Sequence, residues 1–471
     1  MKQVHSFPTL AGPLAAASAY ATGYRESKTN LHPTATLAQL RNSFGGDLPA
    51  KGQPGEQVIA DLIKAAEPGL VGNTQPGFHA WVMGSSHPVG VAADWLTSVW
   101  GQNAALYQGS PAAATAEETA CDWLLDILDL PREASVGITT GATMAGFIGL
   151  AAARDELLRR AGYDFAETGL QYAPPVTVFV AEDTHASNLA ALRYLGFGTN
   201  NIVAVACDDQ GRMITDDIAR HVARVSGPRI IVATAGHINS GAFDDFHALA
   251  DLAERHGAWL HVDAAFGLWA RASVSTRSLT NGIDRADSWS TDGHKWLQIP
   301  FDAGFAIVRD SQAHRRAMNI TAGYLPDDPD DGRNATHFNT ELSRRARGFT
   351  VWATLKALGR EGIADMIRNH CDCASLLAHK LRRLPGIRIH NDVMLNQLIL
   401  SFDRGRGDAD ANRMTQAMEA ALNADGQHFF RTATWQERCV LRVSIISVDT
   451  GPEHIQTLAQ KIEALWHDIR R

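Results

Sequence analysis

Short apolar runs alternate with amphipathic segments through the middle of the chain. Six runs are expected to be strands: one near 136–139 and others at 176–181, 202–207, 229–235, 258–265 and 303–308. Strands that are apolar at nearly every position and separated by helices are typical of a parallel sheet covered on both faces. The pattern therefore predicts an α/β fold with a mainly parallel sheet.

The segments between these runs have the spacing of helices. Residues 116–130 place four apolar side chains on one helical face: Trp123, Leu124, Ile127 and Leu128. Another helix is expected after residue 214, with Thr215 as its N-cap, because threonine can accept a hydrogen bond from the first turn. The helix over 244–257 is expected to end at Gly257, a residue that tolerates the left-handed conformation.

The pattern changes near both ends of this region. Residues 1–88, which contain the glycine- and proline-rich stretch 45–56, are expected to form an N-terminal arm. Residues 89–345 are expected to form the large domain and 346–471 a smaller C-terminal α/β domain. Three strands are expected in the smaller domain, at 386–390, 395–402 and 439–446.

Composition limits the partners of the protein. The 471 residues carry a formal net charge of −8, so no basic face for nucleic acid is implied. No apolar run reaches membrane-spanning length. The five cysteines include one close pair, Cys371 and Cys373, whose spacing on a predicted helix suits neither a metal nor a redox site. Reduced thiols in the cytoplasm are therefore expected.

Small residues follow the first predicted strand. Gly141, Ala142 and Thr143 lie at the expected start of a helix, where free backbone N–H groups bind phosphate. An ordinary glycine-rich turn between a strand and a helix has the same composition. This motif alone therefore does not establish a phosphate site.

Polar residues follow three later strands, at the edge where ligands bind in sheets of this kind. His185 and Thr234 come at the ends of two strands, and Asp263 lies at the end of a third. A lone histidine at such a place is more often a hydrogen-bonded structural group. A buried aspartate requires a cationic partner, a helix to cap or backbone donors.

Lys295 lies in the segment DGHKWL (292–297), with Trp289 before it and Trp296 directly after it. A lysine among aromatic residues either extends its apolar stem along them or is held for chemistry. Both interpretations of Lys295 are open when the segment is taken by itself.

One cofactor accounts for all of these residues together. Pyridoxal phosphate requires a lysine amine for its Schiff base, a carboxylate beside its pyridinium nitrogen, a flat group against its ring and a cradle for its phosphate. We therefore expect pyridoxal 5'-phosphate as the cofactor, and no metal.

Seven segments in this order match one known family: GSPAAATAEE (109–118), TGATMA (140–145), EDTHAS (182–187), VATAG (232–236), WLHVDAAF (259–266), DGHKWL (292–297) and LSRRARGFTVWATLKALG (342–359). The His-Lys and HVDAA motifs at this spacing are specific. From about residue 70 to its end, the chain resembles the group II pyridoxal-phosphate-dependent decarboxylases, which include aromatic amino acid, histidine and glutamate decarboxylases.

The resemblance implies a role for each matching residue. Lys295 forms the Schiff base, Asp263 pairs with the pyridine nitrogen and His185 stacks on the ring. The remaining implied contacts are Gly141, Ala142, Thr143, Asp292 and His294 around the phosphate, and Thr234 and Ala265 at the ring or its substituents. A Schiff-base lysine requires a partly desolvated site, which explains the aromatic neighbours of Lys295.

The resemblance also implies a fold and an assembly. The fold is the type I fold of pyridoxal-phosphate-dependent transferases, similar to aspartate aminotransferase. A homodimer with shared active sites is implied, because family members place the N-terminal arm and the GSPAA segment against the partner subunit.

One loop departs from the family pattern. Family decarboxylases carry a tyrosine there that protonates the carbon left when CO2 departs, but residues 334–338 contain none. His337, Tyr324 or water is then the proton donor. His237 and Ile238 also replace a Thr-Thr pair of the family.

The predicted function is decarboxylation of an L-amino acid to its amine through Lys295. The alternatives are decarboxylation with oxidative deamination to an aldehyde, other α-carbon chemistry such as transamination or lyase cleavage, and cofactor binding without catalysis. The segment 75–88 resembles the substrate side of the family, and Phe78, His79 and Trp81 there weakly favour aromatic substrates. The same residue types are as often part of a core.

Overall fold

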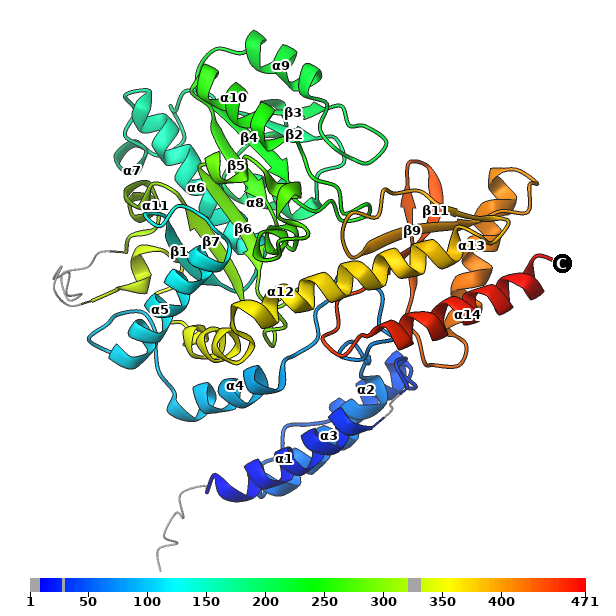
Figure 1. Ribbon diagram of the computed structural model, residues 1–471. Helices are drawn as coiled ribbons and strands as arrows, with labels where there is room; N and C mark the ends of the chain where they lie inside the picture. Colours follow the sequence, from blue (N-terminus) through cyan, green and yellow to red (C-terminus); the bar gives the residue numbers. More distant parts are fainter. Residues whose placement is uncertain (1–8, 28–29, 321–331) are drawn as a thin grey trace, which may run out of the picture.

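The computed structural model describes residues 9–27, 30–320 and 332–471 (Figure 1). Within these residues, seven strands form the larger sheet in the order β1-β7-β6-β5-β4-β2-β3. They are β1 (Ser135–Thr139), β2 (Thr177–Ala181), β3 (Ile202–Val205), β4 (Arg229–Thr234), β5 (Trp259–Asp263), β6 (Ser288–Asp292) and β7 (Gly304–Val308). Strand β7 runs antiparallel to both of its neighbours, and the other pairs are parallel. The predicted mainly parallel sheet is confirmed.

Helices cover both faces of this sheet. They are α5 (Pro111–Ile127), α6 (Ala142–Arg160), α7 (Phe165–Thr168), α8 (Ala186–Tyr194), α9 (Thr215–Arg224), α10 (Phe246–His256) and α11 (Ser311–Met318). Along β4, Ile230 and Val232 belong to one buried cluster and Ile231 and Ala233 to another. Successive residues of a strand face opposite sides, so burial of both faces accounts for the nearly continuous apolar runs.

Strand β6 was not predicted from the sequence, although it lies in the middle of the sheet. Its residues Ser288, Ser290 and Thr291 are polar but at most 1% exposed. The hydroxyl of Ser288 accepts a hydrogen bond from Trp259 Nε1 at 2.8 Å, which satisfies a buried polar group. This polar strand is stabilised by the partners of its Ser288 and Thr291 hydroxyls, and an apolar-run criterion does not detect it.

The predicted helix ends were partly right. Helix α10 ends at Gly257 in the left-handed conformation, with φ of 61°, as predicted. The prediction of Thr215 as an N-cap was wrong, because α9 begins at Thr215 and its N-cap is Ile214, without a side-chain bond. Two aspartates in the first turn, Asp216 and Asp217, complement the helix dipole there instead.

The C-terminal part contains a second, antiparallel sheet in the order β10-β11-β9-β8. Its elements are α12 (Arg347–Leu381), β8 (Ile387–Ile389), β9 (Gln397–Phe402), α13 (Asp408–Asn423), β10 (Arg431–Trp435), β11 (Arg438–Ser444) and α14 (Pro452–Ile469). The three predicted strands are present. The polar edge strand β10 was missed. Helix α12 runs from the large sheet to the small one (Figure 1) and has non-helical angles at Gly359.

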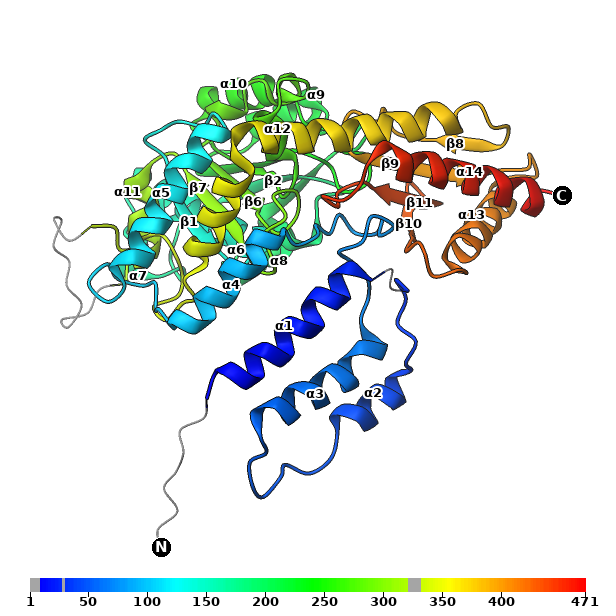
Figure 2. The ribbon, with the colours of Figure 1, turned by 60° about the horizontal axis from the view of Figure 1, so that its bottom comes forward.

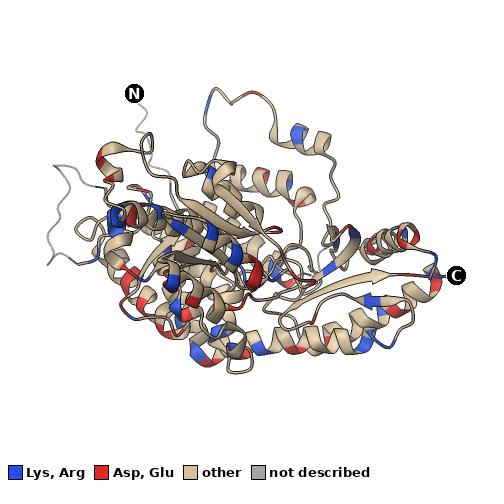
Figure 3. Cartoon of the chain, turned by 90° about the horizontal axis from the view of Figure 1, so that it is seen from above, with Lys and Arg blue, Asp and Glu red and all other residues tan. Residues whose placement is uncertain are grey.

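The N-terminal helices α1 (Ala11–Glu26), α2 (Leu37–Phe44) and α3 (Gly55–Ala66) project from the body as an arm (Figures 1 and 2). Helix α4 (Pro88–Trp100) follows and packs against α12. The domain boundaries at residues 88 and 345 stay a prediction. Acidic and basic residues are interspersed along the described chain (Figure 3). In the described part of the chain, no helix has the length and apolar character needed to cross a bilayer.

Candidate active site

A cavity of about 440 Å³ opens where β5 and β6 end and α6 begins. It brings together the following predicted residues: Gly141, Ala142, Thr143, His185, Asp263, Ala265, Asp292, His294 and Lys295. These residues come from four separate segments of the chain. The carboxyl edge of the sheet therefore gathers the predicted chemistry in one place, as expected for this type of sheet.

Lys295 lies in the turn that follows β6, with 20% of its side chain exposed. Its Nζ is 3.0 Å from Oδ2 of Asp292, whose side chain is 4% exposed. The other oxygen of Asp292 accepts the backbone N–H of Ala142 at 2.5 Å. Asp292 therefore links the lysine to the first turn of α6 and holds its amine at the cavity.

Gly84 packs closely against the backbone of Lys295. A Cβ atom added at Gly84 would lie 1.9 Å from the carbonyl oxygen of Lys295. Only a residue without a side chain allows this approach, so the segment before α4 supports the turn that carries the lysine.

Asp263 ends β5 and is 8% exposed. Its Oδ2 accepts a hydrogen bond from Asn188 Nδ2 at 2.8 Å, and its Oδ1 accepts the Ala265 N–H at 3.3 Å. Within the described ranges, no lysine, arginine or histidine forms an ion pair with Asp263. Neutral donors fix the orientation of the Asp263 carboxyl group and leave it without a cationic partner, as a site for a cationic ligand requires.

His185 is the N-cap of α8, and its ring is fixed by Ser187. The Nδ1 atom lies 2.6 Å from Ser187 Oγ and accepts the Ser187 N–H at 3.2 Å. Nδ1 is therefore an acceptor, and the neutral ring carries its proton on Nε2. Desolvation by burial lowers the pKa of His185, partly opposed by the charge of Asp263. A neutral ring in one orientation suits stacking on a flat ligand.

His294 forms a second side of the cavity. Its ring lies 4.3 Å from the ring of Phe301, and its Nδ1 accepts the Ala303 N–H at 3.2 Å. Burial is the main cause that lowers the pKa of His294, against the charge of Asp292. The imidazole therefore enters the site as a neutral group.

The start of α6 can receive a phosphate. A Cβ atom at Gly141 would lie 3.1 Å from His294 Cε1 and 3.2 Å from Asp292 Oδ1, so glycine keeps this space open. Asp292 already accepts the Ala142 N–H, and the following N–H groups of the first turn remain for an anion. The lysine, carboxylate, imidazole and glycine cradle together fit pyridoxal phosphate.

Two predicted residues of the described ranges do not line this cavity. Thr234 ends β4, where its N–H donates to Asp244 Oδ2 at 2.7 Å. His337 belongs to the short helix η6 (Ala335–His337), with its ring 6.1 Å from that of Phe338. Tyr324 lies outside the described residues. The roles of all three stay predictions.

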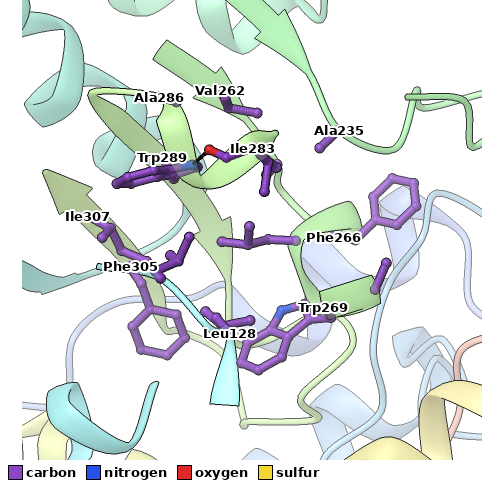
Figure 4. Close-up of a cluster of buried hydrophobic side chains, with 14 of the residues drawn as sticks. Leu128, Ala235, Val262, Phe266, Trp269, Ile283, Ala286, Trp289, Phe305 and Ile307 are labelled. Carbon is purple, nitrogen blue, oxygen red and sulfur yellow. Dashed lines mark hydrogen bonds between the residues drawn. The ribbon is translucent and has the colours of Figure 1, made fainter. Parts of the chain in front are cut away.

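The aromatic neighbours of Lys295 were wrongly identified from sequence. Trp289 and Trp296 are both fully buried, and neither lines the cavity. Trp289 donates its indole N–H to Ile283 and packs inside the core (Figure 4). The aromatic residues that do line the cavity are Phe266 and Phe301. Adjacent residues of a turn can point to opposite sides, so proximity in sequence misled here.

The three aromatic residues of the predicted substrate segment do not line this cavity. Phe78 and His79 are each 2% exposed, and they stack on Phe429 and Phe430 at 5.0 and 4.7 Å. Of the two interpretations of these residues, the structure supports the core. Trp81 is 48% exposed and does not line the cavity.

Several residues near the site were not predicted. They are Met144, Ser187, Ile238, Phe266 and Phe301 in the cavity lining, with Asn188 and Arg442 behind it. Ser187 and Asn188 had a signal, since both are polar and follow His185 at the start of a helix. Arg442 comes from β11 and donates to the carbonyl of Ile238 at 2.7 Å, and burial lowers its pKa to about 10. No local sequence pattern predicts the contact between Arg442 and Ile238.

Comparisons with known proteins place the chain among decarboxylases. The family model "Pyridoxal-dependent decarboxylase conserved domain" matches residues 38–402. An aromatic-L-amino-acid decarboxylase of Bacillus atrophaeus is 26% identical over 439 residues, which cover 91% of this chain and 89% of that protein. An L-2,4-diaminobutyrate decarboxylase of Rhizobium meliloti is 28% identical over 430 residues, which cover 88% and 83%.

Solved structures share the architecture. Oryza sativa TDC with PLP and tryptamine superposes with a TM-score of 0.92 at 23% sequence identity, covering 100% of both chains. A Rhodiola rosea 4-hydroxyphenylacetaldehyde synthase superposes with a TM-score of 0.88 at 20% identity, covering 99% of this chain and 100% of that one. At these identities the likeness establishes the fold.

Proposed function

Because the chain belongs to the pyridoxal-dependent decarboxylase family, we propose that it converts an L-amino acid to its amine and CO2, with Lys295 as the Schiff-base lysine. Its fold is the type I fold of pyridoxal-phosphate-dependent enzymes, as predicted. Its cofactor is pyridoxal phosphate, and the protein is a carboxy-lyase. The amino acid, the product and the residue roles belong to the proposal.

The observation that carries the proposal is the meeting of Lys295, Asp263 and His185 in one cavity. When bound, the cofactor supplies an electron sink for the bond that breaks at the α-carbon. Lys295 presents its amine beside Asp292, and Asp263 offers a carboxylate that no cation of the described residues neutralises. His185 presents a fixed, neutral ring. An intact set of this kind favours catalysis over mere cofactor binding.

The product of the reaction depends on whether the α-carbon receives a proton after CO2 departs. We propose that His337 or Tyr324 delivers it to the α-carbon, which yields the amine, because histidine titrates near neutrality and is an effective acid there. Aldehyde formation with O2 is the second candidate, favoured by the absence of tyrosine at residues 334–338. Transamination or lyase cleavage is a further alternative on the same residues.

We also propose a homodimer with shared active sites. Large apolar side chains are exposed on the arm and on α4, and a second subunit would cover them: Leu37 (63%), Phe44 (57%), Leu62 (52%), Leu96 (48%) and Trp100 (48%). Exposed apolar surface of this kind commonly marks an interface.

The five cysteines are unpaired, which fits a reducing compartment, and we propose the cytoplasm.

A panel of L-amino acids, supplied with the purified protein and pyridoxal phosphate, tests the function. Amine and CO2 in equal amounts, without O2 consumption, is the expected result. Aldehyde and peroxide in step with CO2 would select the oxidative route. Absence of CO2 release from every amino acid, with the cofactor bound, would overturn the proposal.

A further inference from the structure

Asn188 lies directly behind the carboxylate of the cavity. It is on α8, three residues after His185, and it is 4% exposed. Its Nδ2 donates to Asp263 Oδ2 at 2.8 Å and to Thr184 Oγ1 at 3.2 Å. Its backbone N–H donates to the His185 carbonyl at 3.0 Å. Both hydrogens of the side-chain amide nitrogen therefore have acceptors, and one of them is directed at Asp263.

The chemistry of this donor suits the task of Asp263. An amide N–H stabilises an ionised carboxylate and carries no charge of its own. A lysine or arginine in the same place would neutralise Asp263 and compete with a cationic ligand. With Asn188 on Oδ2 and the Ala265 N–H on Oδ1, the carboxyl group is fixed in orientation by two donors that carry no charge.

We propose that Asn188 is a positioning residue that holds the carboxylate of Asp263 oriented toward the ring nitrogen of pyridoxal phosphate. The inference rests on the role proposed above for Asp263. Asn188 does not line the cavity, so it acts through Asp263 and not on the substrate. Its influence should appear in the cofactor itself as well as in turnover.

Three variants separate the hydrogen bond from the space that the side chain fills. Asn188→Leu keeps the approximate size and removes the donor. Asn188→Asp keeps the shape and replaces the donor with an oxygen. Asn188→Gln retains an amide donor. The readouts are the dissociation constant of pyridoxal phosphate, the pH titration of its visible absorption band in the bound state, and kcat and KM.

We expect Asn188→Leu and Asn188→Asp to bind pyridoxal phosphate about tenfold or more weakly, since a hydrogen bond to a charged group is lost. Both should shift the pH titration of the absorption band and lower kcat more than they change KM. Asn188→Gln should recover part of each loss. Asn396→Leu removes a fully buried amide that donates to the Ile445 carbonyl at 2.9 Å, and it should leave the absorption band unchanged.

Asp263→Asn, measured in parallel, separates the role proposed for Asn188 from the role proposed for Asp263. If Asp263→Asn is impaired while Asn188→Leu keeps the wild-type cofactor affinity and the wild-type pH titration of the absorption band, only the role proposed for Asn188 is overturned. Wild-type behaviour in both would overturn the role proposed for Asp263. Should Asn188→Leu fail to fold, Asn188→Asp decides by the same readouts, because it has the shape of the native side chain.

Discussion

The indole N–H of Trp296 donates to Nδ1 of His370 at 2.9 Å, and both side chains are fully buried. This bond ties the turn that carries Lys295 to helix α12. The opposite nitrogen of His370 lies 2.9 Å from the Ser447 carbonyl. Because Nδ1 accepts and Nε2 donates, the bond pattern requires the neutral ring.

The first prediction concerns acid stability. Burial lowers the pKa of His370 from 6.5 to about 4. The unfolded chain therefore binds this proton first, so the contribution of His370 is complete above pH 6.5 and is lost as pH falls toward 4. The full loss is on the order of 3 kcal/mol. His261 and His314, with pKa values lowered by burial to about 3, add losses of the same sign.

Urea midpoints at pH 7.5, 6.5 and 5.5 measure this dependence. His370→Gln, whose amide can both accept from Trp296 and donate to Ser447, should weaken the loss of stability between pH 6.5 and 5.5. His467→Gln changes an exposed histidine of α14 and should keep the wild-type dependence. Equal pH dependence in His370→Gln and the wild type would refute the prediction.

The second prediction concerns a buried ion pair between two of the family segments. Arg344 Nη1 lies 2.7 Å from Glu117 Oε2, and both side chains are 1% exposed. The same guanidinium donates to the carbonyls of Ala104 and Ile138 at 2.9 and 2.7 Å. Arg344→Met should lower the free energy of unfolding by about 3–5 kcal/mol, because Glu117 is left charged and buried.

The double variant Glu117→Leu with Arg344→Met supplies the control for that pair. It removes both charges and should recover part of the stability that Arg344→Met loses, as measured by denaturant midpoints. Glu117→Leu alone is the second single variant of this cycle. A double variant whose loss equals the sum of the two single losses would show that the charges do not interact.

The third prediction concerns the site of cofactor attachment. Borohydride reduction of the holoenzyme followed by peptide mapping should find the cofactor on the peptide with Lys295. Lys295→Ala should lose both the visible absorption of bound cofactor and turnover, because no other amine lines the cavity among the described residues. Lys356→Ala, which removes an exposed lysine stacked 4.6 Å from the Trp352 ring, should retain both. Label on any other lysine contradicts the assignment.

The fourth prediction concerns the proton donor. A residue that acts as general acid contributes roughly 10²–10⁴-fold to rate. Either His337→Gln or Tyr324→Phe should therefore reduce amine formation by about 100-fold or more, while cofactor affinity stays unchanged. Products should be followed in air and without oxygen. Wild-type amine formation in both variants would leave water as the donor.

The sequence by itself determined the class of the fold. Apolar runs that bury both faces of each strand leave a parallel sheet with helices on both sides as the stable arrangement. The parallel direction of these strands puts their carboxyl ends at one edge, so Asp263 and Lys295 could be predicted together from their motifs. Gly257 was predictable as a helix end because its conformation depends on local backbone geometry.

Only the tertiary structure decided which side chains are partners. Asn188 and Asp263 are 75 positions apart, and Trp296 and His370 are 74 apart. Strand β6 is polar, and its place in the middle of the sheet depends on hydrogen bonds such as the one that Trp259 of β5 donates to the Ser288 hydroxyl. In the turn after β6, the side chain of Lys295 lines the cavity and the side chain of Trp296 is buried in the core. Such choices follow from packing between distant segments, and local periodicity carries no record of that packing.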